Sequence, residues 1–292
     1  MLERILVPLD GSERGELALE YARELAIGLG SEVRLVCATE KKDAATLNVC
    51  NIYLSRLIDK MAAQIKAANP RASLKDIVLE GVAADVLLRY AADENIGLIV
   101  LTSHGHGGVM PWSMGGTADR VMHHSHTPVL MVRSGHKATG KGSLFSRILL
   151  PLDGSPMGEA ALPYVERIAS ALGSEVVLLM VVETIMRVHS LGGPDHILFS
   201  EQQVEQMKQE AAEYLDGVSK RFPKGKVRTA VRTGDPAHEI LKASADEAVS
   251  LTAMSSHGKS GISQWMLGSV TNKILHADRV PFLLVRPPGK TG

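Results

Sequence analysis

The sequence predicts an α/β fold built twice in one chain, with two tandem, doubly wound, five-stranded parallel sheets that carry helices on both faces. Three observations predict it. The chain has 292 residues, enough for two domains at about 150 residues each. Residues 4–12, RILVPLDGS, recur almost unchanged at 147–155 as RILLPLDGS. Within each copy, short apolar runs alternate with segments whose apolar residues have helical spacing. We therefore expect domains over residues 1–135 and 145–292.

The duplication holds along the chain at two different offsets. Near the start of each copy, matching residues lie 143 positions apart. From Gly81 and its counterpart Gly234 onwards, they lie 153 positions apart. The second copy therefore carries ten extra residues, which we expect around 183–200. The segment 134–146 is rich in Gly, Ser and Lys, which is typical of a solvated linker.

Each copy is predicted to have the order βαβαβαβαβ, which favours a parallel sheet. Strands are expected at 4–9, 32–38, 74–80, 97–102 and 128–133, and again at 147–152, 175–182, 226–233, 249–254 and 281–286. Helices are expected at 14–28, 47–68, 82–93 and 113–125, and again at 157–171, 200–221, 235–247 and 266–276.

Charge and composition exclude several classes of partner. Lys plus Arg and Asp plus Glu both number 32, so no long-range basic field attracts nucleic acid or an anionic membrane. Aromatic residues make up 4% of the chain, which argues against a stacking surface for single-stranded nucleic acid. The longest apolar run, 176–182, is far too short to span a bilayer. We therefore expect neither nucleic acid nor membrane as a partner.

The two cysteines, Cys37 and Cys50, are too few for a disulfide framework. We expect both to be reduced thiols: Cys37 buried in a strand with no base nearby, and Cys50 at the start of a helix with no partner. The N-terminal sequence, MLERILVPLDGS, has charged residues before any apolar stretch of signal-peptide length. These features predict a cytoplasmic protein.

The residues that carry chemistry follow the strands, where a doubly wound sheet binds its ligands. The first strand of each copy ends on PLDGS. A glycine-rich loop follows the fourth strand, with SSHG at 255–258, nine residues, and GS at 268–269. The first copy has TSHG at 102–105, nine residues, and GG at 115–116. Glycines let backbone N–H groups turn toward one point, and the next helix adds positive potential, so this loop is predicted to hold an anion.

These motifs together resemble the universal stress protein family, and the chain looks like a tandem member with two such domains. The resemblance rests on PLDGS, on SHG with the nine-residue spacing, and on a final strand that begins Pro-Val or Pro-Phe. It covers nearly the whole chain twice, except the linker and the insertion. It implies an adenine nucleotide alpha hydrolase-like, Rossmann-like fold. It also implies ATP as the ligand, with ADP or AMP as alternatives and magnesium left open.

The resemblance also implies which residues form the nucleotide sites. Asp153 is expected to face the ribose or adenine, Val181 to line the base pocket, and Gly258 and Gly268 to approach the polyphosphate. In copy two the expected binding residues are Pro151, Asp153, Val181, Ser255, His257, Gly258, Gly268, Ser269 and Val270. In copy one they are Pro8, Asp10, Ala38, Thr102, His104, Gly105, Gly115, Gly116 and Thr117.

Both copies depart from the family pattern, which begins the loop with glycine. Thr102 and Ser255 stand there, where a β-carbon narrows the approach although a hydroxyl could still reach a phosphate. Copy one also has Gly116 in place of the serine or threonine of the pattern, and Ala38 where the family usually has a bulkier residue. We therefore expect copy two to be the better nucleotide site.

Single-domain members of the resembled family dimerise through their last strands. Residues 128–133 and 281–286 are apolar edge strands that need cover. We therefore expect the two copies to pair through them within one chain, as an intramolecular pseudo-dimer. A further homodimer of two chains is left open.

The histidines of the chain have alternative interpretations. His104 and His257 either touch a phosphate or are satisfied by backbone groups. His123, His124 and His126 lie at a predicted helix end, where histidine favours the C-terminal dipole, and lack a two-sided ligand set. We therefore expect no metal site there.

The function predicted from these features is a cytoplasmic stress-response module that binds adenine nucleotide for regulation. No complete P-loop motif (GxxxxGKS or GxxxxGKT), water-positioning Gln or paired acidic metal site is evident, so no catalytic residue is assigned. Two alternatives stay open. One is a nucleotide-free dimerisation or interaction module. The other is a slow, magnesium-dependent ATPase, with Asp153 beside the phosphates.

Overall fold

The computed structural model describes residues 1–41, 43–104, 114–133, 143–190, 193–223, 225–259 and 267–287, with the backbone alone at 185–198. The first copy of the repeat forms lobe one. Its elements are β1 (Arg4–Leu9), α1 (Glu13–Leu29), β2 (Glu32–Thr39), α2 (Ala44–Ala68), β3 (Ser73–Glu80), α3 (Ala83–Asp93), β4 (Leu98–Thr102), α4 (Gly116–His124) and β5 (Val129–Val132).

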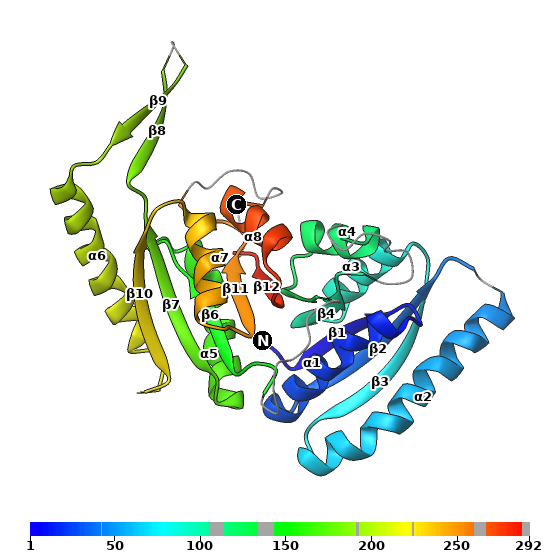
Figure 1. The fold of residues 1–292 in the computed structure, drawn as a ribbon. Coiled ribbons are helices and arrows are strands. Elements are labelled where there is room, and N and C mark those ends of the chain that lie inside the picture. Colours follow the sequence, from blue (N-terminus) through cyan, green and yellow to red (C-terminus); the bar gives the residue numbers. More distant parts are fainter. Residues whose placement is uncertain are drawn as a thin grey trace.

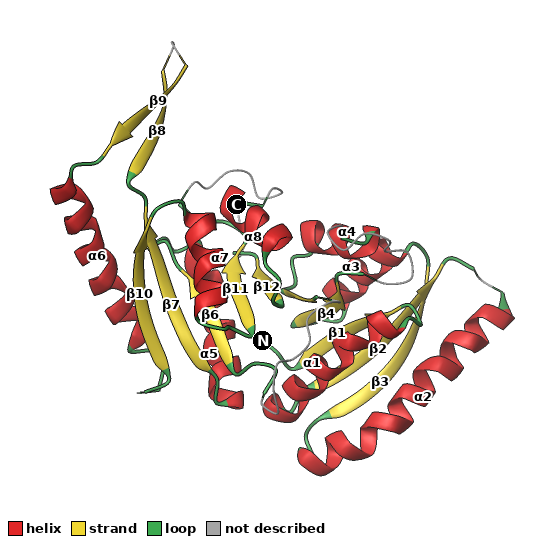
Figure 2. Cartoon of the chain, in the orientation of Figure 1, coloured by secondary structure: helices red, strands yellow, loops and turns green. Residues whose placement is uncertain are grey.

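The second copy forms lobe two, which repeats this order with two additions. It contains β6 (Arg147–Pro151), a 3₁₀ turn (Gly158–Ala161), α5 (Leu162–Leu172), β7 (Glu175–Val182), β8 (Ile185–Ser190), β9 (Gly193–Leu198), α6 (Glu201–Ser219), β10 (Val227–Thr233), α7 (Pro236–Asp246), β11 (Leu251–Ser255), α8 (Ser269–Ala277) and β12 (Phe282–Val285). The predicted alternation of strand and helix is therefore confirmed in both copies (Figure 2).

The two lobes share one ten-stranded sheet, in the order β10-β7-β6-β11-β12-β5-β4-β1-β2-β3. Within each lobe the neighbouring strands are parallel. The lobes meet where β12 pairs antiparallel with β5, with Leu283 opposite Leu130. This contact confirms the expected pseudo-dimer through the final strands, and Figure 1 shows β12 where the two halves of the molecule meet.

Each face of the sheet carries a hydrophobic layer that runs through both lobes. On one face, buried residues of α1, α2, α5 and α6 form a single cluster, which includes Leu25 and Ile168. On the other face, α3, α4, α7 and α8 form a second cluster. At the junction, a β-carbon on Gly28 of α1 would come closer to the Leu172 side chain of α5 than real β-carbons approach. Because the cores are continuous, the lobes are expected to unfold together.

Among the helices that differ from the expected ranges, two do so for reasons visible in the sequence. The helix expected at 157–171 is split into a 3₁₀ turn and α5, and Pro163 lies in the first turn of α5. An unbroken helix would place that proline in its interior, where it has no N–H to donate. Helix α2 begins three residues earlier than expected, because the Asp43 side chain caps it by accepting a hydrogen bond from the Thr46 amide.

The ten-residue insertion of lobe two forms an antiparallel hairpin of β8 and β9, within the range expected for it. The hairpin pairs Ile185 with Leu198 at its base and Ser190 with Gly193 near its tip. It projects away from the sheet that the other strands form (Figure 1).

Arginines that follow the two final strands join the lobes a second time. Arg286 of lobe two donates to the carbonyls of Met122, His123 and Ser125 at the end of α4, at 3.3, 2.5 and 2.8 Å. Arg133 of lobe one donates to the Leu275 carbonyl at the end of α8. A cation at a helix C-terminus stabilises the helix dipole, so each lobe caps a helix of the other.

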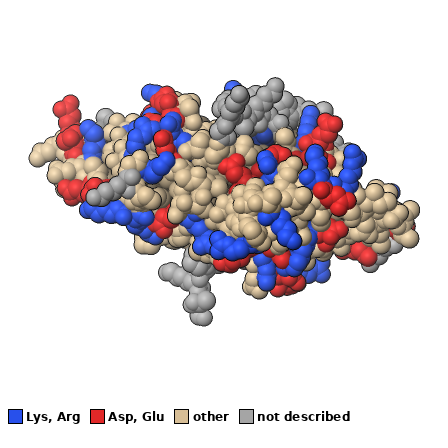
Figure 3. Space-filling model, turned by 90° about the horizontal axis from the view of Figure 1, so that it is seen from below, with Lys and Arg blue, Asp and Glu red and all other residues tan. Residues whose placement is uncertain are grey.

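The surface matches the balanced composition. On the face that Figure 3 shows, acidic and basic side chains are interspersed. Within the described ranges, none of the helices combines the length and the apolar character needed to cross a bilayer.

Candidate functional site

A cavity opens at the carboxyl edge of the sheet in each lobe, at the predicted place. In lobe two it has a volume of about 790 Å³ and lies at the ends of β6, β7 and β11 and the start of α8. In lobe one the corresponding cavity has about 330 Å³ and lies at the ends of β1, β2 and β4 and the start of α4. The strand order reverses here, because β6 has β7 on one side and β11 on the other.

The residues singled out in the sequence lie around these cavities, with two exceptions. In lobe two, the cavity is lined by Pro151, Asp153, Val181, Ser255, His257, Gly258, Gly268, Ser269 and Val270. In lobe one, it is lined by Pro8, Asp10, Ala38, Thr102, Gly115, Gly116 and Thr117. His104 is buried but is not among the lining residues, and Gly105 lies outside the described residues.

Asp153, at the end of β6, is held by hydrogen bonds from two loops. Its Oδ1 accepts from the amide and hydroxyl of Ser155, at 2.9 and 2.7 Å. Its Oδ2 accepts from the Lys259 amide at 2.7 Å. This last bond ties the end of β6 to the loop that follows β11, although the two residues are 106 positions apart.

Two glycines make room for this carboxylate. A β-carbon on Gly158 would come too close to Asp153 Oδ1, and one on Gly258 would come too close to Oδ2. The expected reason for glycine at 258 was close approach to a polyphosphate. In the structure the first atoms that a side chain there would meet belong to Asp153. Lobe one repeats the arrangement, with Asp10 accepting from Ser12 and packed against Gly15.

Helix α8 begins at the cavity without a side-chain cap. Helices α1, α2, α6 and α7 begin after Ser or Asp residues whose side chains accept a hydrogen bond from the first turn. The N-cap of α8 is Gly268, and among the described residues no side chain caps its first turn. The amides of the first turn, at Ser269 and Val270, have no partner within the helix. They remain available to an anion, and the helix dipole favours negative charge there.

Some polar groups of the loop form hydrogen bonds within the loop itself, so fewer groups are left to bind an anion than the glycine pattern predicts. The Gly268 amide donates to the Ser256 carbonyl at 2.8 Å. The Ser255 hydroxyl accepts from the His257 amide at 3.3 Å, and the Thr102 hydroxyl donates to the His104 carbonyl at 3.0 Å. The two hydroxyls that stand where the family pattern has glycine therefore bond within their own loops.

The loop histidines contact the serines before them. The Ser103 hydroxyl lies 3.1 Å from His104 Nδ1, and the Ser256 hydroxyl lies 2.8 Å from His257 Nδ1. Burial lowers the pKa of His104, and the positive charges of Arg14 and Arg133 lower it further. His104 is therefore neutral at physiological pH, which favours a role in holding the loop rather than a charge-based contact with phosphate.

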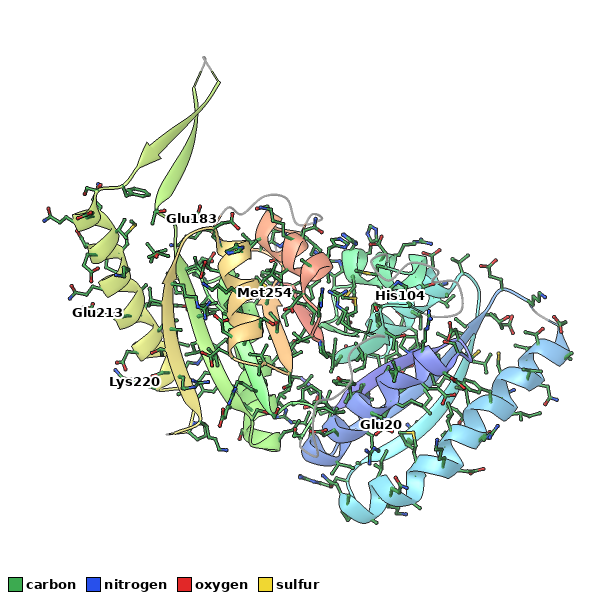
Figure 4. All side chains as sticks on the ribbon, viewed as in Figure 1. Glu20, His104, Glu183, Glu213, Lys220 and Met254 are labelled. Atoms are coloured by element: carbon green, nitrogen blue, oxygen red, sulfur yellow. The ribbon has the colours of Figure 1, made fainter. Side chains whose placement is uncertain are left out.

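The lobe-two cavity is larger because it reaches helix α6. Met207, Ala211 and Tyr214 of α6 line it, together with Phe199 just before the helix. The glycine motif gives no sign of these residues, although the apolar face of the predicted helix 200–221 is a signal that could have found them. Figure 4 labels Met254 on β11 and Glu183 at the foot of the hairpin, and both residues line this cavity.

His123, in the histidine cluster at the end of α4, contacts a residue of its own helix. Nδ1 of His123 lies 2.9 Å from the Asp119 carbonyl and 3.3 Å from the Asp119 carboxylate. These contacts are within one helical turn of α4, so His123 is engaged by its own helix.

Comparisons with known proteins agree with this fold and motif pattern. A universal stress protein of Mycolicibacterium smegmatis is 28% identical over 196 residues, which are 67% of this chain and 64% of that protein. One of Mycobacterium tuberculosis is 28% identical over 227 residues, covering 78% and 74%. The crystal structure of a universal stress protein from Archaeoglobus fulgidus has a TM-score of 0.68 at 20% identity and covers 97% of this chain and 98% of its own, so the fold is shared over the full length.

The sequence model described as the universal stress protein family matches the chain twice, at residues 1–133 and 144–286. The two matches correspond to the two lobes and leave out most of the linker. The chain therefore belongs to the universal stress protein family, as a tandem member with two copies of the family's domain.

Proposed function

We propose that this chain binds an adenine nucleotide, ATP first, in the lobe-two cavity and acts in the cytoplasm as a regulatory module of a stress response. One observation carries the proposal. All the binding residues expected in copy two, from three separate stretches of sequence, line a single cavity that ends on the uncapped first turn of α8. Its volume of about 790 Å³ lies within the usual range of small-molecule sites.

The chemistry of the cavity supports a ligand with an apolar ring and an anionic tail. Val181, Ile240 and Met254 supply apolar surface on one side. The first turn of α8 supplies amide donors and positive potential on the other. Ser269 adds a hydroxyl at the start of the helix. These groups orient a nucleotide, with the base against the strands and the phosphates at α8.

Lobe one is proposed as the weaker of two sites, one in each of the domains proposed at 1–135 and 145–292. Its cavity has less than half the volume of the lobe-two cavity. Gly116 stands where lobe two has Ser269, so the hydroxyl donor is missing. Among the described residues, no side chain caps the first turn of α4 either, so the anion-binding end is retained.

The residues do not fit a magnesium ion held by the protein. Asp153 already accepts three hydrogen bonds, from Ser155 and Lys259. Across the described ranges, no group of three or more His, Cys, Asp and Glu residues could hold a metal.

Equilibrium binding of ATP, ADP and AMP to matched charge variants tests the proposal. Ser269→Asp places a negative charge at the first position of α8, where the helix dipole stabilises it, so the fold should be retained. A like charge about 6 Å from a phosphate costs about 3 kcal/mol at an effective dielectric constant of about 20. We therefore expect ATP affinity at lobe two to fall about 100-fold.

Gly116→Asp is the matched variant in lobe one, and it should leave the tighter site unchanged. Nucleotide released by heat from the purified protein, identified by mass spectrometry, shows which ligand the wild type carries. If ATP, ADP and AMP all fail to bind the wild type, or if Ser269→Asp binds ATP as well as the wild type does, the proposed site is wrong. A nucleotide-free interaction module would then be the better account.

A further inference from the structure

The only cysteines of the chain lie against each other in lobe one. Sγ of Cys37, near the end of β2, is 2.8 Å from Sγ of Cys50 in the second turn of α2. The separation is about 0.8 Å more than the length of a disulfide bond. Both residues are described as free thiols and are buried, each with 8% of its surface exposed. The sequence-based expectation that Cys50 has no partner is therefore wrong.

The contact is a property of lobe one that lobe two does not share. Tyr53 of α2 donates to Glu16, and Tyr214 of α6 donates to Glu159, so these two tyrosines are structural counterparts. With the tyrosines aligned, Ala211 of lobe two is the counterpart of Cys50, and the repeat makes Met180 the counterpart of Cys37. The pair of thiols replaces a methionine and an alanine, so packing alone does not require two cysteines at these positions.

We propose that Cys37 and Cys50 form a disulfide under peroxide stress, which clamps the start of α2 onto β2. The balanced reaction uses hydrogen peroxide as the oxidant. The thiolate of Cys37 attacks the O–O bond, which gives a sulfenic acid and hydroxide, and the thiol of Cys50 then displaces water from the sulfenic sulfur. Two S–H bonds and one O–O bond break, one S–S bond forms, and two water molecules leave.

The surroundings of the pair slow its oxidation. Burial raises the pKa of the Cys37 thiol to about 12, and the neighbouring Cys50 and the Asp10 carboxylate add to the rise. The thiolate is the reactive species, so Cys37 reacts slowly and needs a small oxidant rather than a bulky disulfide. Such a pair responds to sustained peroxide, not to the ordinary thiol pool of the cell.

The disulfide would act on the lobe-one cavity. Val36 and Ala38, on either side of Cys37 in β2, line that cavity. Cys37 itself faces the opposite side of the sheet, toward α1 and α2. A covalent bond to α2 would restrain the end of β2 on the face of the sheet away from the cavity. Oxidation is therefore expected to reduce the motion of the part of β2 that lines the cavity. The bond itself does not depend on the proposed nucleotide function.

Intact mass spectrometry of the full chain, before and after treatment with hydrogen peroxide, tests the proposal. We expect a loss of two hydrogen atoms, loss of both thiols to an alkylating reagent under denaturing conditions, and recovery of both after reduction. The chain should stay monomeric on a non-reducing gel, and peptide mapping should join Cys37 to Cys50. The oxidised form should also have a higher urea midpoint than the reduced form.

Two variants separate a built pair from incidental oxidation. Cys50→Ser removes the resolving thiol, so peroxide should add oxygen to Cys37 or link two chains, and no single chain should lose two hydrogens. The double variant Cys37→Met, Cys50→Ala carries the residues of lobe two and should keep the fold and show neither change. If both wild-type thiols stay open to alkylation after prolonged exposure to excess peroxide, or if they join only between chains, the proposal is overturned.

Discussion

Replacing Gly258 by alanine tests the close packing around Asp153. The new β-carbon would lie closer to Asp153 Oδ2 than the 3.0 Å that real β-carbons keep, and 3.2 Å from Asp153 Cγ. Either the carboxylate or the loop after β11 must move, which breaks the 2.7 Å hydrogen bond from the Lys259 amide. A hydrogen bond to a charged group contributes about 1.5–3 kcal/mol, and overpacking costs about 1–3 kcal/mol. Because this bond is exposed, we expect a total of about 2–4 kcal/mol.

A double-mutant cycle with Asp153→Ala measures the clash itself. Without the carboxylate, the β-carbon of Gly258→Ala has room, so the substitution should cost less than about 1 kcal/mol in that background. The free energy of unfolding is measured by urea denaturation followed by circular dichroism. The shared cores predict a single transition for both lobes. If Gly258→Ala costs the same with and without Asp153, the carboxylate is not the reason for the glycine.

Three further predictions concern the lobe contact, a buried ion pair and pH. Arg286→Ala removes three hydrogen bonds to the end of α4, so the free energy of unfolding should fall by about 2–4 kcal/mol in urea denaturation. An unchanged free energy would show that this helix cap does not stabilise the contact between the lobes. The side chain of Arg34 is 7% exposed and pairs with two glutamates, whereas that of Arg147 is 32% exposed. Arg34→Met should therefore lower the free energy of unfolding by about 1–3 kcal/mol, and Arg147→Met by less than about 1 kcal/mol. Equal losses for the two variants would contradict this. The folded-state pKa of His104 lies below its ordinary value of 6.5, so the contribution of neutral His104 to stability is present above that pH and is lost as pH falls. His104→Gln should therefore lose less stability than the wild type between about pH 7 and about pH 5. An equal loss in the variant and the wild type would contradict this prediction.

The sequence was sufficient for the fold and for the position of the candidate site. The exact repeat of PLDGS and of the glycine spacing predicted two equivalent sheets, and the apolar final strands, with the family resemblance, predicted that the two copies pair through them. These features are local patterns or repeats, so they can be recognised in a single sequence. The lining of the cavity by Asp153, Gly258 and Gly268 followed, because the carboxyl ends of parallel strands meet at one edge.

The contacts within the site depend on loop geometry that no local pattern contains. The bond between Asp153 and the Lys259 amide spans 106 positions and gives Gly258 a reason that the family motif does not suggest. The sequence allowed the hydroxyls of Thr102 and Ser255 to reach a phosphate. In the structure both hydroxyls form hydrogen bonds within their own loops, which the sequence does not show.

The thiol contact was missed because it depends on how α2 packs against β2, which no local pattern shows. Cys50 was placed at the start of a helix, whereas the cap at Asp43 begins α2 earlier and brings Cys50 to its second turn. The spacing of Cys50, Leu54 and Leu57 is that of one buried helix face, so the sequence did contain the signal that this thiol points inward.

The most direct test of the nucleotide proposal is the behaviour of the amides at the start of α8. We expect the ¹H–¹⁵N signals of Ser269 and Val270 to move when ATP is added and to move less with adenosine, because the phosphates lie at these amides. Ser269→Asp should remove the difference between the two ligands. If ATP shifts signals elsewhere in the chain but leaves Ser269 and Val270 unchanged, nucleotide binding at the first turn of α8 is contradicted.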